Sequence, residues 1–162
     1  MNIIITVDNN WAYANQGKAL VQIPEDAQLI MHETVGKVVF MDSVGRERFP
    51  GGQLMDNRIN IVIGDKSCYN SSNVILCDTP KQALEVAKEY SSESVYILGG
   101  KNVYDFFLPE CDTVHATKIN YEYQADTKLE NLDASSEWIV SQRSDEHTYF
   151  DLEYEFVKYV RQ

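Results

Sequence analysis

The sequence predicts a single α/β domain with a central, mostly parallel sheet, an antiparallel C-terminal edge and helices on both faces. Three observations indicate this fold. Short apolar, β-branched runs alternate with helical patterns up to Pro109, which is typical of a parallel sheet covered by helices. After Pro109 the predicted strands become longer, and the last two are suited to pair as a terminal antiparallel hairpin. The length of 162 residues, without a repeat or an obvious linker, fits one domain over residues 1–162.

Before Pro109, strands and helices are predicted in alternation. The strands are expected at Ile3–Val7, Lys37–Met41, Asn60–Ile63, Val74–Cys77 and Ser94–Leu98. The helices are expected at Pro24–Thr34, Pro80–Tyr90 and Lys101–Leu108. The stretch "DTPKQALEVAKEY" carries a helix start signal, with Thr79 as the N-cap and Pro80 at the first helical position. After Pro109, longer strands are expected at His115–Ile119, Trp138–Ser144 and Tyr154–Arg161.

Composition and charge argue against several classes of function. The formal net charge of −11 disfavours a nucleic-acid partner, because a phosphate backbone requires a basic surface. No apolar run approaches membrane-spanning length, and the N-terminus "MNIIITVDNN" lacks the basic leader of a signal peptide. Cys68, Cys77 and Cys111 are odd in number, far apart and outside any zinc-ligand pattern, which is typical of reduced thiols. We therefore expect a cytoplasmic protein with no membrane partner and no bound metal.

A carboxylate on an apolar helix face is the first candidate for chemistry. In "QIPEDAQLIMHET", residues 22–34, Pro24 suits a first helical turn and Asp26 lies four residues before Ile30. The two side chains share one face of the helix, so Asp26 points into the protein if Ile30 does. Taken alone, an aspartate in a first turn is usually an exposed partner of the helix dipole.

The strongest local signal is "YILGGKNVYDFF", residues 96–107. A hydrophobic strand runs into two glycines and then into a helix. Glycines at such a junction let a ligand approach the backbone, and the helix N-terminus offers N–H groups to a phosphate. The alternative is a tight strand-to-helix turn without a ligand, because a lone Gly-Gly pair is a weak motif.

Six segments occur in the order and at the spacing of one enzyme family. Val7-Asp8 and "GKALVQIPED", residues 17–26, compare with the family's "VD" and "G-x-L-P-W-x-L-P-x-D". "TVGKVVFMDSVG", residues 34–45, compares with "T-x-G-K-x-V-x-M-G-R-x-T", and "PGGQLMDNRINIV", residues 50–62, with "P-G-G-x-P-L-x-x-R-x-N-I-V". "LGGKNVY", residues 98–104, compares with "I-G-G-x-x-x-Y", and "ADT", residues 125–127, with "G-D-T". The chain therefore resembles the dihydrofolate reductases nearly from end to end.

The resemblance implies roles for residues on the folate side. Asp26 matches the acidic residue that holds the pterin ring and favours the protonated ring that accepts hydride, and Thr117 matches the threonine that shares its hydrogen-bond network. Arg58 matches the arginine that pairs with the glutamate carboxylate of the substrate, although alone it would pass for a solvated loop arginine. The walls of the substrate site are implied at Thr6, Ile30, Met55 and Leu98.

On the cofactor side the resemblance implies NADPH, with NADH as the alternative, and the chain departs from the family pattern. In "M-G-R-x-T", Asp42 replaces the glycine, Ser43 the arginine and Gly45 the threonine. Asp65 stands where a threonine or serine usually lies near the 2′-phosphate, and "AYA", residues 12–14, replaces a glycine pair and is expected to stiffen that loop. Arg46, Arg48 and Lys66 are the nearby basic residues that could compensate. The implied cofactor-binding residues are Ala14, Gly17, Ser43, Gly45, Asp65, Gly99, Gly100, Lys101, Asn102 and Tyr104.

These matches imply a monomeric enzyme that reduces 7,8-dihydrofolate to 5,6,7,8-tetrahydrofolate with NAD(P)H, the small-molecule substrate being its partner. Two alternatives remain open. One is a catalytically degraded homologue that binds a pterin or nucleotide or serves as a scaffold. The other is a reductase of a different pterin or of a pyrimidine, against which Arg58 argues because such substrates lack the glutamate tail.

Overall fold

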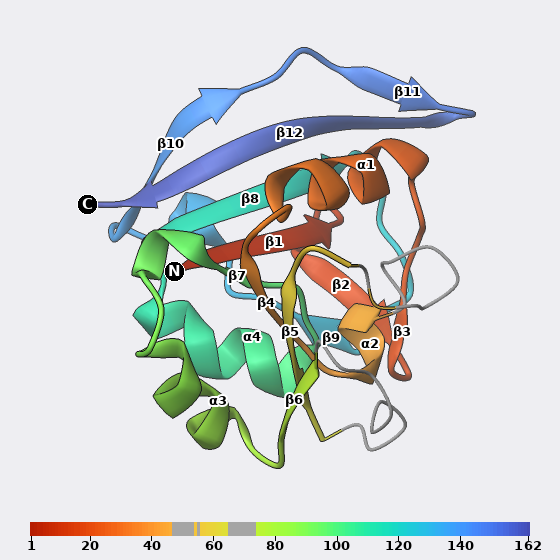
Figure 1. Cartoon of the computed structure of the whole chain (residues 1–162). Coiled ribbons are helices and arrows are strands. Elements are labelled where there is room, and N and C mark those ends of the chain that lie inside the picture. Colours follow the sequence, from red (N-terminus) through yellow and green to blue (C-terminus); the bar gives the residue numbers. More distant parts are fainter. Residues whose placement is uncertain (47–53, 55, 65–73) are drawn as a thin grey trace.

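The computed structural model describes residues 1–46, 54, 56–64 and 74–162, and it places nine of their strands in one central sheet (Figure 1). The strand order is β10-β12-β8-β1-β7-β4-β5-β6, and β11 pairs with β12. These strands are β1 (Asn2–Val7), β4 (Val38–Met41), β5 (Ile59–Ile63), β6 (Val74–Cys77), β7 (Val95–Ile97), β8 (Thr113–Ile119), β10 (Trp138–Arg143), β11 (His147–Tyr149) and β12 (Leu152–Arg161).

The direction of the strands divides the sheet into two parts. Every pairing from β8 through β1, β7, β4 and β5 to β6 is parallel. By contrast, β12 pairs antiparallel with β8, β10 and β11. The mostly parallel sheet with an antiparallel C-terminal edge is therefore confirmed, as is the pairing of the last two predicted strands.

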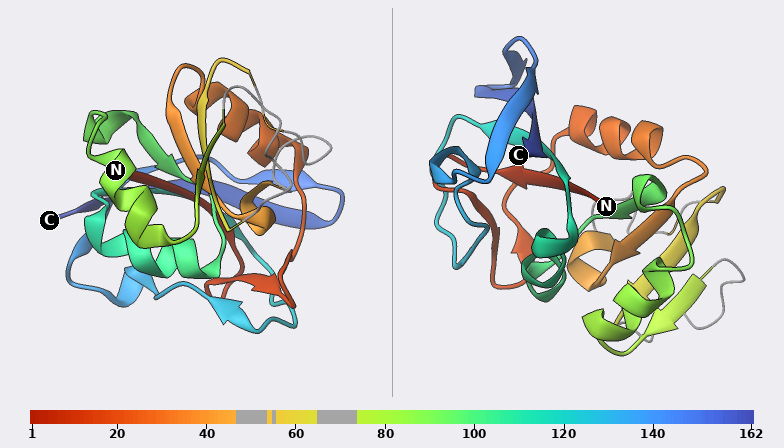
Figure 2. Two further views of the ribbon diagram at one scale, coloured as in Figure 1. Left: turned by 60° about the horizontal axis from the view of Figure 1, so that its bottom comes forward. Right: turned by 90° about the vertical axis from the view of Figure 1, so that its left-hand side faces the viewer.

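Helices cover both faces of the sheet, as predicted (Figure 2). Along β1, Ile4 belongs to the buried cluster that includes Ile30, whereas Ile3 and Ile5 belong to the cluster that includes Phe107. Successive residues of a strand point to opposite faces, so these two clusters mark the two sides of the sheet. The helices are α1 (Pro24–Glu33), α2 (Ser43–Arg46), α3 (Pro80–Ala87) and α4 (Lys101–Phe107), with 3₁₀ turns at Ser92–Ser94, Leu108–Glu110 and Leu132–Ala134. None of the described helices is long and apolar enough to cross a membrane.

Local hydrogen bonds decide where the elements begin and end. The Thr79 hydroxyl accepts a hydrogen bond from the Gln82 N–H at 3.2 Å, so the predicted N-cap of α3 is confirmed. The helix predicted over Pro80–Tyr90 ends at Ala87, because the Tyr90 N–H bonds to the carbonyl three residues back rather than four. The strand predicted from Ser94 begins at Val95, because Ser94 closes a 3₁₀ turn.

A second sheet of three short strands is absent from the sequence prediction. Its order is β3-β2-β9, formed by β2 (Ala12–Asn15), β3 (Lys18–Ala19) and β9 (Thr127–Lys128). The buried Asp8 ties the segment before β2 to the segment before β9. Its Oδ1 accepts hydrogen bonds from the N–H groups of Asn10 and Ala12 at 2.8 and 2.9 Å, and its Oδ2 accepts one from the Tyr123 N–H at 2.9 Å. Strands this short carry too little alternation to be detected from the pattern alone.

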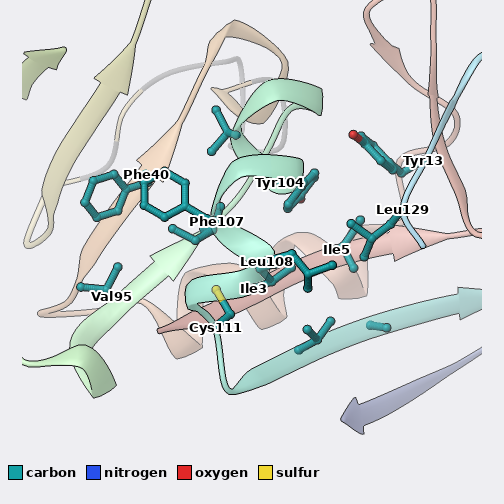
Figure 3. Packing of buried hydrophobic residues seen from close by; sticks show 14 of the residues in the cluster. Ile3, Ile5, Tyr13, Phe40, Val95, Tyr104, Phe107, Leu108, Cys111 and Leu129 are labelled. Atoms are coloured by element: carbon teal, nitrogen blue, oxygen red, sulfur yellow. The ribbon is translucent and has the colours of Figure 1, made fainter. Parts of the chain in front are cut away.

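An aromatic side chain of the small sheet packs against α4. Tyr13 of β2 meets Tyr104 of α4 edge-on, with ring centroids 5.0 Å apart and an interplanar angle of 83° (Figure 3). Both rings belong to the large buried cluster on the α4 side of the sheet. The segment that was expected to be a stiffened loop at residues 12–14 is therefore a strand that is anchored in the core.

Candidate active site

Asp26 lies in the first turn of α1, on the side of the helix that faces the sheet. Its side chain and that of Ile30 are buried, so the predicted inward face of this helix is confirmed. The Thr117 hydroxyl donates to Asp26 Oδ1 at 2.9 Å, and the Thr6 hydroxyl donates to Oδ2 at 2.7 Å. Each carboxylate oxygen thus accepts one hydroxyl, and the two hydroxyl donors together orient the Asp26 side chain.

The two threonines are brought together by the register of the sheet. Thr6 of β1 and Thr117 of β8 are Cα partners in a parallel pair. Partners in register point to the same face, and neighbouring strands lie about 4.8 Å apart, so both hydroxyls reach one carboxylate. The strand pairing therefore fixes the orientation of the acid on the helix above.

The apolar residues beside Asp26 form one buried cluster. Ile30 lies one helical turn after Asp26 and is fully buried together with Leu98, Ile4 and Met41. The structure thus brings the predicted wall residues Ile30 and Leu98 together. The carboxylate of Asp26 stands at the edge of this apolar surface.

Arg58, just before β5, is buried rather than solvated, with only 8% of its surface exposed. Its Nε donates to the Thr34 hydroxyl at 2.8 Å, its Nη1 to the Asp56 carbonyl at 2.8 Å and its Nη2 to the Met31 carbonyl at 2.5 Å. Burial lowers the pKa of the guanidinium, although an arginine stays charged at neutral pH. A guanidinium has five N–H groups, so within the described part of the chain one N–H on each terminal nitrogen has no acceptor.

Asp26 and Arg58 mark the two ends of α1. Asp26 lies in the first turn, whereas Arg58 is bound to Met31 and Thr34 at the other end. With a rise of about 1.5 Å per residue, these positions are separated by about 8–12 Å along the helix axis. The arrangement suits an extended ligand that has a hydrogen-bonding ring at one end and a carboxylate at the other.

The turn from β7 into α4 is packed too closely for side chains. Gly99 has a φ of +124°, and a Cβ there would lie 3.2 Å from the Tyr104 ring. A Cβ on Gly45 of α2 would lie 2.9 Å from the Gly99 carbonyl oxygen. The Asp42 N–H donates to that same oxygen at 2.8 Å. Glycine at positions 45 and 99 therefore allows α2 to lie directly against this turn.

Asp42 precedes α2, and its carboxylate is engaged with that helix. Its Oδ1 accepts the Gly45 N–H at 3.1 Å, and its carbonyl accepts the Arg46 N–H at 3.0 Å. This is the arrangement of an N-cap. A carboxylate thus stands at the helix end that the family resemblance assigns to the cofactor pyrophosphate.

The predicted cofactor residues of the small sheet lie in its first hairpin. Ala14 is buried in β2, and Gly17 lies in the turn to β3 with a φ of +75°. The hairpin is tied to β9, because Asp126 Oδ2 accepts the Gln16 N–H at 3.0 Å. Hydrogen bonds from the Thr127 hydroxyl and the Gln16 N–H lower the pKa of Asp126.

The predicted residues of α4 divide into exposed and buried groups. Lys101 and Asn102 are exposed in the first turn, and the Lys101 charge helps to lower the pKa of Asp126. Tyr104 is buried, and its hydroxyl donates to the Ile4 carbonyl at 2.8 Å. The start of α4 is therefore close to the hairpin of the small sheet.

Some predicted positions lie outside the described residues. These are Met55, Asp65, Arg48, Lys66 and the side chain of Ser43. Arg46, the remaining basic residue of that region, lies in the last turn of α2. Among the described residues, no group of three His, Cys, Asp or Glu side chains could hold a metal ion.

Sequence reasoning missed the residues that support α1. Thr34 accepts from Arg58 and donates to the Ile30 carbonyl at 2.6 Å, which its place in the quoted motif did not reveal. At the other end, the Tyr154 hydroxyl donates to Glu25, and His147 Nδ1 lies 3.3 Å from Glu25 Oε2. Burial and the contact with Glu25 raise the pKa of Tyr154 to about 12. No local signal connects these residues, because they meet only through the fold.

Comparisons with known proteins point to one family. The family model described as dihydrofolate reductase matches residues 1–161. The dihydrofolate reductase of Bacillus subtilis is 25% identical over 163 residues, which cover 98% of this chain and 93% of that protein. The dihydrofolate reductase of Haemophilus influenzae is 25% identical over 156 residues, which cover 93% of this chain and 88% of that protein.

A solved structure has the same fold. The dihydrofolate reductase from Enterococcus faecalis complexed with NADP(H) and RAB-propyl matches with a TM-score of 0.78, covering 99% of this chain and 95% of that chain. The sequence identity is 21%, so this likeness concerns the fold alone. With the family model extending over residues 1–161, the chain belongs to the dihydrofolate reductase family.

Proposed function

We propose that this protein reduces 7,8-dihydrofolate to 5,6,7,8-tetrahydrofolate with a reduced nicotinamide nucleotide, the reaction of its family. The observation that carries the proposal is the buried Asp26 carboxylate, held between the Thr6 and Thr117 hydroxyls. A site for dihydrofolate needs such an acceptor at an apolar wall, because the pterin presents an amino group and a ring N–H to it.

Asp26 is proposed to orient the pterin and to favour its protonated form. Its two oxygens would accept the hydrogen bonds of the pterin amino group and ring N–H, while the two threonines prevent the carboxylate from rotating away. When bound, the reduced nicotinamide supplies a hydride to the pterin C6, and a proton reaches N5 from water near Asp26. The contribution of the protein is alignment and charge.

Arg58 is proposed to bind the glutamate carboxylate of the substrate. The two N–H groups that the described residues leave without an acceptor belong to different terminal nitrogens, which is the fork that a carboxylate accepts. The bonds to Thr34, Met31 and Asp56 hold the guanidinium in place before the substrate arrives. This contact favours dihydrofolate over pterins or pyrimidines that have no such tail.

The described residues fit a nicotinamide nucleotide in part. Gly45 and Gly99 let α2 pack directly against the turn from β7 into α4, and the nucleotide is proposed to bind beside this backbone contact. The Asp42 carboxylate, in contrast, opposes a phosphate at the start of α2. NADPH is the family norm, and we propose it as the cofactor, with NADH as the alternative that tolerates additional carboxylates better.

Asp42 also supports a second candidate function. Its carboxylate occupies the Gly45 N–H, which is a donor that a cofactor phosphate would otherwise use. A chain that keeps the folate side but binds cofactor poorly would act as a pterin-binding protein with little turnover. This candidate and the reductase predict different results in the same assay.

The test is oxidation of NADPH and, separately, of NADH by the purified protein with dihydrofolate, followed by absorbance. We expect turnover with at least one cofactor, and Asp26→Asn should lower kcat by about 10²- to 10⁴-fold at neutral pH. Full activity in Asp26→Asn would contradict the assignment of that residue. If neither cofactor is consumed while folate still raises the melting temperature, the pterin-binding protein is the correct reading.

A further inference from the structure

The first turn of α1 is tied to the C-terminal hairpin by Glu25, the carboxylate next to Asp26 in the chain. Glu25 Oε2 accepts a hydrogen bond from the Tyr154 hydroxyl of β12, and His147 Nδ1 of β11 lies 3.3 Å from the same oxygen. His147 and Tyr154 are Cα partners, and their rings stack with centroids 5.6 Å apart and an interplanar angle of 23°. Two residues of the β11–β12 hairpin therefore converge on one oxygen at the start of the helix (Figure 1).

The start of α1 depends on such contacts because it has no side-chain cap of its own. The N-cap is Ile23, whose side chain has no oxygen to accept the N–H groups of the first turn. The Ile23 side chain is instead buried in one cluster with Ile119 and Tyr154. Tyr154, which is only 4% exposed, thus packs near the N-cap and also bonds to Glu25, the second residue of the helix.

The sheet places Tyr154 beside the groups that orient Asp26. Thr117, which donates to Asp26 Oδ1, is the Cα partner of Phe156 in the β8–β12 pair. Tyr154 stands two residues before Phe156 on β12, so both side chains point to the face of the sheet on which α1 lies. The strand that holds the Asp26 carboxylate and the strand that holds Glu25 are therefore neighbours.

Tyr154 is also coupled to Asp26 through charge. Burial, the hydrogen bond to Glu25 and the charges of Glu25 and Asp26 raise the pKa of Tyr154 to about 12. The hydroxyl therefore stays protonated at physiological pH and remains a donor. Loss of this donor would release the Glu25 carboxylate, which is a negative charge one residue before Asp26, and like charges repel.

We infer that Tyr154 is a positioning residue for Asp26: through Glu25 it fixes the first turn of α1 and thereby the direction in which the Asp26 carboxylate meets a bound pterin. The inference rests on the proposed function, because it assumes that Asp26 holds the pterin of dihydrofolate. A small displacement is enough to matter, because a misplacement of about 1 Å can lower a rate by about 10²-fold. The C-terminal hairpin thus takes part in catalysis by holding the helix that carries the acid.

The test compares the wild type with Tyr154→Phe at a temperature well below the melting temperature of both proteins. We expect kcat with dihydrofolate to fall about three- to tenfold, the effect of one lost hydrogen bond on the alignment of Asp26. The KM for the cofactor should not change, because the variant leaves the turn from β7 into α4 intact. The dissociation constant of folate, measured by calorimetry without cofactor, should rise by a similar factor.

Variants of Glu25 show whether Tyr154 acts through it. Glu25→Gln keeps an oxygen for the Tyr154 hydroxyl, so it should retain more activity than Glu25→Ala. A double variant with Tyr154→Phe and Glu25→Ala should be no slower than the slower single variant, because both changes remove the same contact. Losses in kcat that multiply would show that the two residues act independently and would overturn the inference.

Tyr159→Phe is the matched control. It removes the hydroxyl of another buried tyrosine of β12, which donates to the Asp133 carboxylate at 2.8 Å, on the opposite face of the sheet. Both variants should melt at a lower temperature than the wild type, but only Tyr154→Phe should be slower. If Tyr154→Phe melts earlier and keeps the wild-type kcat and folate affinity, the bond only stabilises the fold and the inference is wrong.

Failure of the inference and failure of the proposed function give different results. If the wild type reduces dihydrofolate and Tyr154→Phe does so equally well, the positioning role does not exist, and the proposed function stands. If the wild type binds folate without turnover, the reductase is wrong, and the folate dissociation constants of the two proteins decide the inference. If the wild type neither binds folate nor reduces dihydrofolate, both proposals are wrong.

Discussion

The proposed folate side and the proposed cofactor side lie on one sheet but differ in how their charges are placed. On the folate side, Asp26 and Arg58 stand at opposite ends of α1, and each is oriented by neighbouring protein groups. On the proposed cofactor side, Asp42 and Asp105 contribute negative charge near Tyr13. The first side therefore combines a carboxylate with a guanidinium, whereas the second has two carboxylates.

This difference teaches that the close packing of a segment does not determine the charge of the side chains beside it. A Cβ at Gly45 or Gly99 would lie too close to neighbouring atoms, so glycine at both positions lets α2 pack against the turn after β7. This packing does not depend on the charge of Asp42. Asp42 in turn satisfies the end of α2 by accepting the Gly45 N–H. The Asp42 carboxylate is thus compatible with the fold of this segment, and we expect its charge to matter only when a phosphate binds nearby.

The largest effect on ligand binding is expected on the proposed folate side, from Arg58→Ala. The variant loses a charge-assisted contact of about 1.5–3 kcal/mol, so the KM for dihydrofolate should rise about 10- to 100-fold. Thr34→Val is the matched control, because it removes the acceptor of Arg58 Nε but keeps the guanidinium. Its KM should change less. An unaltered KM in a folded Arg58→Ala protein would contradict the proposed contact between Arg58 and the substrate carboxylate. The two sides would then not differ in the way described above.

A smaller effect of opposite sign is expected on the cofactor side, from Asp42→Asn. Asparagine keeps an oxygen for the Gly45 N–H and removes the charge, which is worth about 1 kcal/mol for a phosphate about 4 Å away in water. NADPH should therefore bind about fivefold more tightly in a direct titration. Asp151→Asn, in the exposed turn after β11, should have no such effect. Equal NADPH affinity in both variants would mean that the cofactor phosphates pass elsewhere.

The smallest effect concerns the stability of the fold rather than ligand binding. His115 of β8 stacks on Tyr96, with ring centroids 6.3 Å apart. Burial lowers the pKa of His115 and Lys158 adds to the lowering, whereas Glu33 opposes it. The folded chain therefore prefers the neutral ring, and its stability is complete above about pH 6.5, the ordinary histidine pKa, and declines as the pH falls below it.

The measurement is the melting temperature from pH 7.5 to 5.5, for the wild type and for His115→Gln. The wild type should lose stability toward acid, and the variant should lose less, since glutamine does not titrate. Parallel curves for the two proteins would show that other groups cause the acid loss. This experiment sharpens the comparison by separating the stability of the scaffold from the strength of ligand binding.

The sequence by itself determined the main helices and strands and the helix face that Asp26 shares with Ile30. The alternation of apolar runs predicted the parallel strands, and the four-residue spacing placed Asp26 on the same helix face as Ile30. The inward orientation of Asp26 was implied by the resemblance to the family, not by the spacing. Thr79 was recognisable as an N-cap because its hydroxyl competes locally for backbone N–H groups. Such features depend on residues within one or two turns of each other, so periodicity and side-chain chemistry are enough to reveal them.

Only the tertiary structure decided which distant groups meet and which charges acquire partners. Thr6 and Thr117 reach one carboxylate because β1 and β8 are in register, and Asp8 sets the start of a small sheet that no pattern announces. The same holds for Tyr13, whose hydroxyl makes no hydrogen bond within the described residues although its ring packs on Tyr104 of α4. Hydrogen-bond satisfaction depends on distances between segments far apart in the chain, and those distances exist only once the core has packed.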